Sequence, residues 1–160
     1  MNHTTTRRNC LKAVAAAPLA LASQVLPLAA QVSSKAERSK LAMPGLYRGR
    51  VIAVRSEASI VTGKYQAEPV RAMLHKGMQE LTGAGNWAEA WRAFVSPGER
   101  VGIKVNPVGA PHVISAAEVV RELIDGLQAA GIKRNDIVVY DRYRAQFFKA
   151  GFDKWLPEGV

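Results

Sequence analysis

The pattern of apolar and polar positions is clearest between Val101 and Arg142, where it predicts one complete β-loop-α-β unit. The apolar run from Val101 to Val105 predicts a strand, which leads into a loop from Asn106 to Ile114. A second apolar strand is expected from Ile137 to Tyr140. Between them, apolar residues with a 3.6-residue period predict an amphipathic helix: Val119, Val120, Leu123, Ile124 and Leu127.

Both ends of this helix carry recognisable sequence signals. Ser115 and Glu118 have the spacing of a capping box, in which each side chain binds a free backbone N–H of the first turn. Gly131 is placed for the left-handed residue that follows a helix, and Ile132 is placed to pack back on Leu127. The helix is therefore expected to start after Ser115 and to end before Gly131.

Apolar strands on either side of a helix favour a parallel sheet that is buried on both faces. The predicted fold class is therefore α/β, with a mainly parallel sheet and flanking helices. The segment from Arg50 to Arg55, RVIAVR, is expected to form the first strand. Three readable strands are few for such a sheet, so we expect an incomplete domain from the amino-terminal part of a longer protein. Residues 31–160 alone are then expected to be marginally stable, because unpaired strand edges stay open.

Three further helices are expected outside this unit. Pro69 fits the first turn of a helix that Gly83 ends. Asn86 and Glu89 are placed to cap a short helix from Trp87 to Phe94, with its aromatic side chains packed against the sheet. The segment from Tyr143 to Ala150 predicts the last of them.

The first thirty residues read as an export signal. The stretch from Thr6 to Lys12, which contains Arg7 and Arg8, resembles the twin-arginine motif, and an alanine-rich apolar run follows it. Cleavage is expected after Ala22 or Ala30. An uncleaved membrane anchor is the alternative, but the run falls short of the ~20 strongly apolar residues that a span prefers. The predicted organisation is a signal in residues 1–30, a linker in 31–49 and an α/β domain in 50–160. The protein is expected in the periplasm or otherwise exported, meeting the membrane only through its signal.

The charge of the chain does not point to nucleic acid. The formal net charge is +9, and residues 31–160 hold 19 basic and 13 acidic residues, a net charge of +6. The basic residues are scattered, without a basic stripe and interleaved aromatics on any predicted helix, so solvated surface charge is the better interpretation.

The candidate site lies at the carboxyl ends of the two predicted strands, where parallel α/β sheets bind their ligands. The residues expected there are Lys104, Asn106, Ser115, Asp141 and Arg142. Their cations and amide would favour a small anionic ligand such as a carboxylate or phosphate. Two alternatives stay open: Lys104 is only a rim residue, and Asn106, Asp141 and Ser115 only end strands and cap the helix.

The usual signatures of cofactors and hydrolytic chemistry are missing from the sequence. There is no GxGxxG, Walker loop, nucleophile elbow or HExxH. His3, His75 and His112 have no metal-ligand spacing; His75 is expected at the surface and His112 in the candidate loop. Cys10 is the single cysteine and lies in the leader, so the chain has no thiolate set for an iron–sulfur cluster. The cofactor is therefore unknown.

Several short stretches carry a resemblance to a known bacterial family. They are Leu81–Gly83 (LTG), Ala90-Trp91, Val101–Asn106 (VGIKVN) and Tyr140–Arg142 (YDR). In these the chain resembles the "domain of unknown function three-six-two" family, whose members often carry twin-arginine signals. Some members have ferredoxin-like cysteines and the label "iron–sulfur cluster-binding protein", which this chain does not support. The resemblance implies an exported α/β protein.

Two functions follow as expectations. The first is an exported protein that binds a small anionic ligand as part of a redox enzyme, which agrees with the twin-arginine route because that route carries folded proteins, often with cofactors. The second is a non-enzymatic exported binding or accessory subunit that acts with a partner, which the missing cofactor motifs favour.

Overall fold

The computed structural model describes residues 42–160, so the leader with Arg7 and Arg8 and the first part of the linker lie outside the described residues. The described chain mixes helices and short strands, which confirms the coarse α/β class. The helices are α1 (Ala67–Thr82), α2 (Trp87–Arg92), α3 (Ala117–Ala129) and α4 (Arg144–Lys149). The strands are β1 (Ile60–Val61), β2 (Lys64–Tyr65), β3 (Val101–Lys104) and β4 (Ile137–Tyr140).

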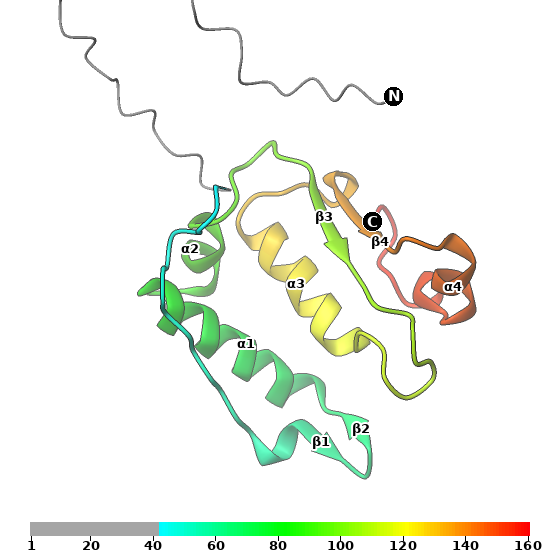
Figure 1. The fold of residues 1–160 in the computed structure, drawn as a ribbon. Helices are drawn as coiled ribbons and strands as arrows, with labels where there is room; N and C mark the ends of the chain where they lie inside the picture. The colour runs from blue at the N-terminus through cyan, green and yellow to red at the C-terminus, as the bar shows by residue number, and fades with distance from the viewer. Residues whose placement is uncertain (1–41) are drawn as a thin grey trace, which may run out of the picture. The chain divides into compact units, whose positions relative to one another are not determined.

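The predicted β-loop-α-β unit is present as β3, α3 and β4 (Figure 1). Strands β3 and β4 pair in parallel, with Val101 opposite Ile137 and Lys104 opposite Tyr140. Strands β1 and β2 form a separate antiparallel hairpin. One core joins the parallel pair to α3 and to the end of the chain, and its buried members are Ile103, Val105, Val120, Ile124, Leu127, Ile132, Ile137 and Phe152.

The two ends of α3 differ in how well the sequence predicted them. At its start the capping-box prediction is wrong: the helix begins at Ala117 without a side-chain cap. Ser115 instead accepts a hydrogen bond from the N–H of Asn106 at 2.9 Å. At its end the prediction is confirmed, because Gly131 has φ 105° and the Ile132 N–H donates to the Leu127 carbonyl at 3.0 Å.

The boundaries of α1 and α2 follow the local signals in the sequence. Gly83 ends α1 in the left-handed conformation, with its N–H donating to the Gln79 carbonyl at 2.7 Å. The Asn86 side chain accepts from the Glu89 N–H at 3.0 Å, and this caps α2. The Glu89 carboxylate accepts from the Gly85 N–H at 3.3 Å rather than from Asn86.

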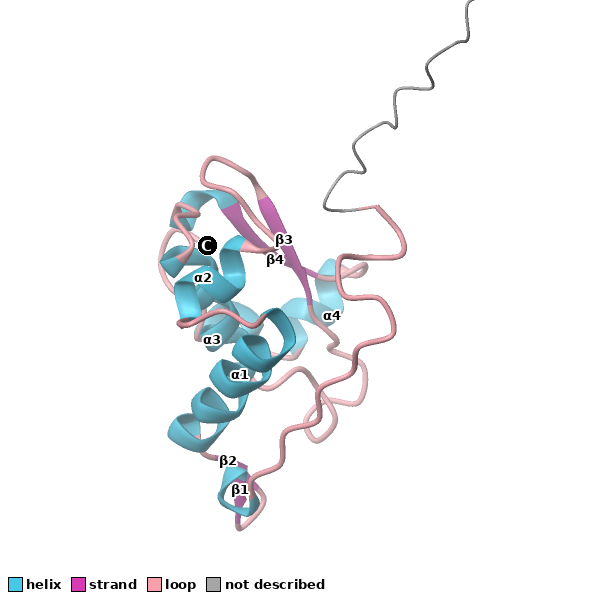
Figure 2. Ribbon diagram, turned by 90° about the vertical axis from the view of Figure 1, so that its left-hand side faces the viewer, coloured by secondary structure: helices cyan, strands magenta, loops and turns pink. Residues whose placement is uncertain are grey.

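The expected strand from Arg50 to Arg55 is wrong, since the structure forms no strand there. Residues 51–55, which we call the strap, instead run as an unpaired segment alongside α1 toward β1 (Figure 2). Exposure still alternates as in a strand, with Ile52 and Val54 turned inward and Val51 88% exposed. The residues have strand character, but among the described residues no other strand lies beside them to pair with.

The aromatic residues of α2 pack among the helices rather than against the sheet. Trp91 lies against Gly126 of α3, and its ring meets that of Trp87 edge-on at 5.5 Å. Trp87 stacks on His75 of α1 with ring centroids 4.0 Å apart. The surface position expected for His75 is therefore wrong: its side chain is 26% exposed, and Nε2 lies 3.5 Å from Oε2 of Glu122.

Candidate functional site

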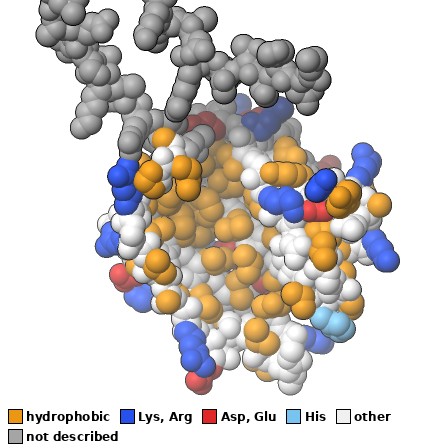
Figure 3. Space-filling view, in the orientation of Figure 1, with side chains coloured by type: hydrophobic (Ala, Val, Ile, Leu, Met, Phe, Trp, Pro, Cys, Tyr) orange, Lys and Arg blue, Asp and Glu red, His pale blue; other side chains and the backbone are white. Residues whose placement is uncertain are grey.

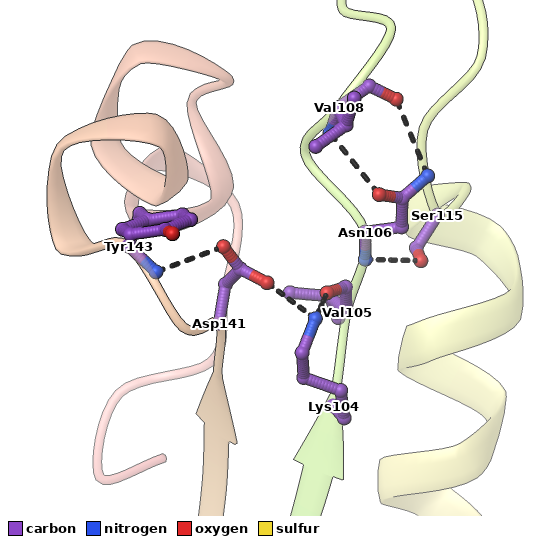
Figure 4. A network of polar contacts seen from close by, with 7 residues as sticks. All are labelled: Lys104, Val105, Asn106, Val108, Ser115, Asp141 and Tyr143. Atoms are coloured by element: carbon purple, nitrogen blue, oxygen red, sulfur yellow. Dashed lines mark hydrogen bonds and ion pairs between the residues drawn. The ribbon is translucent and has the colours of Figure 1, made fainter.

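An ion pair joins the carboxyl ends of β3 and β4 (Figure 4). The Lys104 ammonium donates to Oδ1 of Asp141 and, at 2.6 Å, to the carbonyl of Val105. The two partners differ in exposure, because the Asp141 side chain is 5% exposed and the Lys104 side chain 50% exposed. The parallel register explains the contact: Lys104 lies opposite Tyr140, the residue just before Asp141.

Asp141 is held in its charged form by its hydrogen-bond donors. Oδ1 accepts from Lys104 and Oδ2 accepts from the backbone N–H of Tyr143 at 3.1 Å. The bond from Lys104, followed by that from Tyr143, lowers the pKa of the Asp141 carboxyl below its ordinary value of 3.8. The carboxylate therefore stays ionised and fixes the position of the lysine.

Asn106 and Ser115 form a second pair, which closes the loop between β3 and α3. The Asn106 N–H donates to the Ser115 hydroxyl at 2.9 Å, and the Ser115 N–H donates to the Asn106 carbonyl at 3.1 Å. The Asn106 amide both donates to and accepts from the backbone of Val108 at 3.2 Å. Figure 4 shows Asn106 turned toward Val108 while Lys104 reaches toward Asp141. The five expected site residues thus do not share one set of contacts.

The remaining candidates, Arg142 and His112, are exposed. The Arg142 guanidinium carbon is 5.0 Å from the ring centre of Tyr143, at the distance of a cation–π contact. His112 lies in the β3–α3 loop, where its backbone N–H donates to the Gly109 carbonyl at 3.0 Å. Arg142 therefore adds positive charge to the same edge as the Lys104–Asp141 pair.

A small pocket beside Asp141 was not expected from the sequence. It has a volume of 250 Å³ and is lined by Val139, Tyr140, Asp141, Arg144, Phe147 and Phe148. The Arg144 guanidinium carbon lies 5.2 Å from the ring centre of Phe148. The spacing of Arg144, Phe147 and Phe148 in a short helix was the available signal, because residues three and four apart share a helix face.

An apolar groove of 550 Å³ lies between the strap and α1. Its walls include Ile52, Val54, Met73, Leu74 and Met78, and Arg50 lies at its rim. Figure 3 shows apolar side chains gathered on this hollowed face. No sequence pattern indicated this groove, because the methionines and leucines of α1 have the periodicity of ordinary core residues.

Comparison of the chain with protein-family models, with curated proteins and with solved structures finds no match. The family resemblance of the short motifs therefore stays a prediction. Within residues 42–160 no helix has the length and apolar character to cross a membrane. The same residues contain no group of three or more His, Cys, Asp or Glu side chains placed to hold a metal ion.

The lowered pKa of Asp141 predicts a contribution to stability that depends on pH. Because the folded-state pKa lies below 3.8, the contribution is present above that pH and is lost as the pH falls toward the folded-state pKa. We expect Asp141→Asn to destabilise the protein near neutral pH and to differ less from the wild type at about pH 3. Urea unfolding at both pH values measures this. Asp125→Asn, at an exposed position of α3, is the control, and an Asp141→Asn deficit of equal size at both pH values would contradict the expectation.

Proposed function

We propose that this chain is an exported α/β protein that binds a small anionic ligand at the carboxyl edge of β3 and β4, as part of a redox enzyme. The observation that carries the proposal is the Lys104 ammonium, which two oxygens hold in place while half of the side chain stays exposed. Such a cation is oriented before a ligand arrives, so little conformational freedom is lost on binding.

The donors left at this edge support an anion. An ammonium group has three N–H donors, and Lys104 uses two of them on Asp141 and Val105. Its third donor and the exposed Arg142 guanidinium can both face a ligand. The charge of Asp141 offsets that of Lys104, so Arg142 supplies the net positive charge that attracts a carboxylate or phosphate.

Replacing Lys104 with methionine tests the anion site, because it keeps the apolar stem and removes the charge. Inorganic phosphate and acetate are expected to raise the melting temperature of the wild type and to raise that of Lys104→Met much less. A thermal-shift titration at constant ionic strength measures this. Lys76→Met is the matched control, since Lys76 is also paired with a carboxylate, that of Glu80 at 3.0 Å, but lies on α1. Equal shifts in all three proteins would remove Lys104 from the site.

Export through the twin-arginine machinery is the second half of the proposal. It rests on Arg7 and Arg8, which lie outside the described residues. Replacing both arginines with lysine keeps the charge and is expected to leave the precursor in the cytoplasm. Cell fractionation and immunoblotting measure this. The single change Lys12→Arg is the control, because it leaves both arginines intact. Normal export of the double-lysine variant would exclude the twin-arginine route.

A larger, mainly parallel sheet is proposed around the β3–β4 pair. In the described residues no third strand joins β3 and β4. Val138 and Tyr140 on β4 are 45% and 47% exposed. Apolar strand residues of this kind are usually covered by a second layer in α/β proteins. The unpaired strap favours the second candidate function, an accessory subunit that acts with a partner.

A further inference from the structure

The strap has a row of backbone groups that find no backbone partner among residues 42–160. Residues 51–55 form no backbone hydrogen bond with any described residue, either through N–H or through C=O. Such groups are strong donors and acceptors, and in folded proteins most of them are paired. The strap also has the sequence of a strand, with Val51, Ile52 and Val54 among its five residues. It therefore has the chemistry of an exposed strand edge.

Two hollows border the strap, and residues of α1 line both of them. The apolar groove of 550 Å³ borders Ile52 and Val54 on the side of α1 and the β1–β2 hairpin. A second hollow of 460 Å³ is bordered by the strap together with Lys76 and Glu80 of α1. Val54 packs next to Gly77 of α1: a Cβ added to Gly77 would lie 3.5 Å from Cγ2 of Val54. A second extended chain can thus approach the strap and still reach apolar walls with alternate side chains.

The charge around the strap selects among possible occupants. Arg48 and Arg50 precede the strap, Arg55 is its last residue, and all three are exposed. Antiparallel pairing of 50–55 with a second copy of itself would place Arg50 opposite Arg55 twice, and like charges directly opposite each other are unfavourable. Residues 1–30 hold three basic residues and no acid, so the leader has the wrong charge as well. An acidic segment is the complement.

We propose that the strap is a strand-accepting edge, which binds an extended segment of a partner polypeptide by adding it as a β-strand. Alternate apolar side chains of that segment enter the apolar groove, and its flanking acidic residues pair with Arg48, Arg50 and Arg55. Strand addition of this kind draws affinity from main-chain hydrogen bonds and specificity from pockets for alternate side chains. The inference does not depend on the anion site at β3 and β4, which is formed by other residues.

Binding of a synthetic peptide to the 160-residue chain tests the proposal. The probe is Glu-Val-Thr-Val-Thr-Val-Glu with blocked ends, and the comparison peptide has lysine in place of both glutamates. Fluorescence anisotropy is expected to show saturable binding of the acidic peptide and binding at least about tenfold weaker for the lysine peptide. Hydrogen exchange is expected to slow at alternate amides of residues 51–55, because successive residues of a strand point their N–H groups to opposite edges.

Charge reversal at one flank supplies the decisive variant. Arg55→Glu is expected to weaken binding of the acidic peptide and to strengthen binding of the lysine peptide, since it reverses one contact without touching the core. Arg100→Glu, at an exposed loop position, is the control, because it changes the net charge by the same amount. It should change the two affinities only as far as net charge alone does. Circular dichroism and the urea midpoint confirm that both variants fold.

Three results would overturn the proposal. Strap amides that exchange at the same rate with and without saturating acidic peptide would show that no strand is added there. Equal responses of Arg55→Glu and Arg100→Glu would show that the peptide binds elsewhere. Slowing of strap exchange with rising protein concentration and no peptide would show that a second copy, and not an acidic partner, occupies the edge.

Discussion

Gly126→Ala is expected to destabilise the protein by about 1–3 kcal/mol, the range for overpacking a filled core. A Cβ at this position of α3 would overlap Nε1 and Cε2 of Trp91 and would lie 2.6 Å from its Cδ1. Real Cβ atoms do not approach other atoms so closely, so either the indole or the backbone of α3 must move. Gly126 is buried in the helix layer, which leaves little room for such a shift. The free energy of unfolding in urea measures the loss.

The sign of this effect separates packing from helix propensity. Alanine is favoured over glycine in a helix interior by roughly 0.8–1 kcal/mol, so a glycine with free space around it should gain from the change. Gly77 in α1 is the matched control: its added Cβ would meet Val54 at the ordinary distance of 3.5 Å. Gly77→Ala is therefore expected to be neutral or stabilising. Gly126→Ala would then be destabilising in spite of its better propensity.

A double-mutant cycle with Trp91 identifies the contact responsible. Trp91→Ala removes the ring that the new Cβ would strike, so adding Gly126→Ala to it should cost little or should stabilise α3. If Gly126→Ala lowers the free energy of unfolding equally in the wild type and in Trp91→Ala, position 126 is sensitive for a reason other than Trp91. The cycle also tests whether the packing of α2 on α3 is as close as the structure shows.

Local signals explain why the β3–α3–β4 unit was predictable. The period of Val120, Ile124 and Leu127 identifies the buried face of α3, and Gly131 fixes where the helix ends. Local signals gave the wrong role for Ser115. Its spacing from Glu118 suits a capping box, but its hydroxyl can equally close the loop before the helix. Asn106 lies nine residues earlier in the chain, and its proximity depends on the path of the loop, which sequence spacing does not reveal.

The strap shows the opposite failure. Its residues have strand propensity and strand-like alternation, but a strand exists only where another strand pairs with it. Pairing is a property of distant parts of the fold, so the strand predicted from Arg50 to Arg55 did not form although its residues suit one. The apolar groove escaped prediction for a related reason. Met73, Leu74 and Met78 look like core residues, and only the path of the strap decides whether they are covered.

The candidate site was predicted as a set of residues but not as a set of contacts. Placing Lys104 and Asp141 at one edge required only two parallel strands, whereas their ion pair depends on the register that sets Lys104 opposite Tyr140. A shift of that register by one residue would send side chains to opposite faces of the sheet. The sequence therefore indicated which residues lie at this edge of the strand pair. It did not indicate that Asp141 would hold the ammonium of Lys104.

Phe152→Ala is expected to be the most destabilising of these changes, with a loss of about 3–5 kcal/mol in the free energy of unfolding. Phe152 is fully buried and lies in the same core as Ile124 and Ile137. The centre of its ring lies 5.2 Å from that of Phe147 and 5.6 Å from that of Trp155, so truncation removes two aromatic contacts and leaves a cavity in this core.

Phe148→Ala is the matched control for this truncation, because Phe148 also contacts Phe147, at 5.5 Å, but is 44% exposed. Phe148→Ala should lower the free energy of unfolding much less, since an exposed ring buries less apolar surface on folding. Urea unfolding of the three proteins measures the two losses. Equal losses would mean that the segment after β4 does not complete the core of the β3–α3–β4 unit. A large loss for Phe152→Ala alone would show that this segment completes the core that also contains Ile137 of β4.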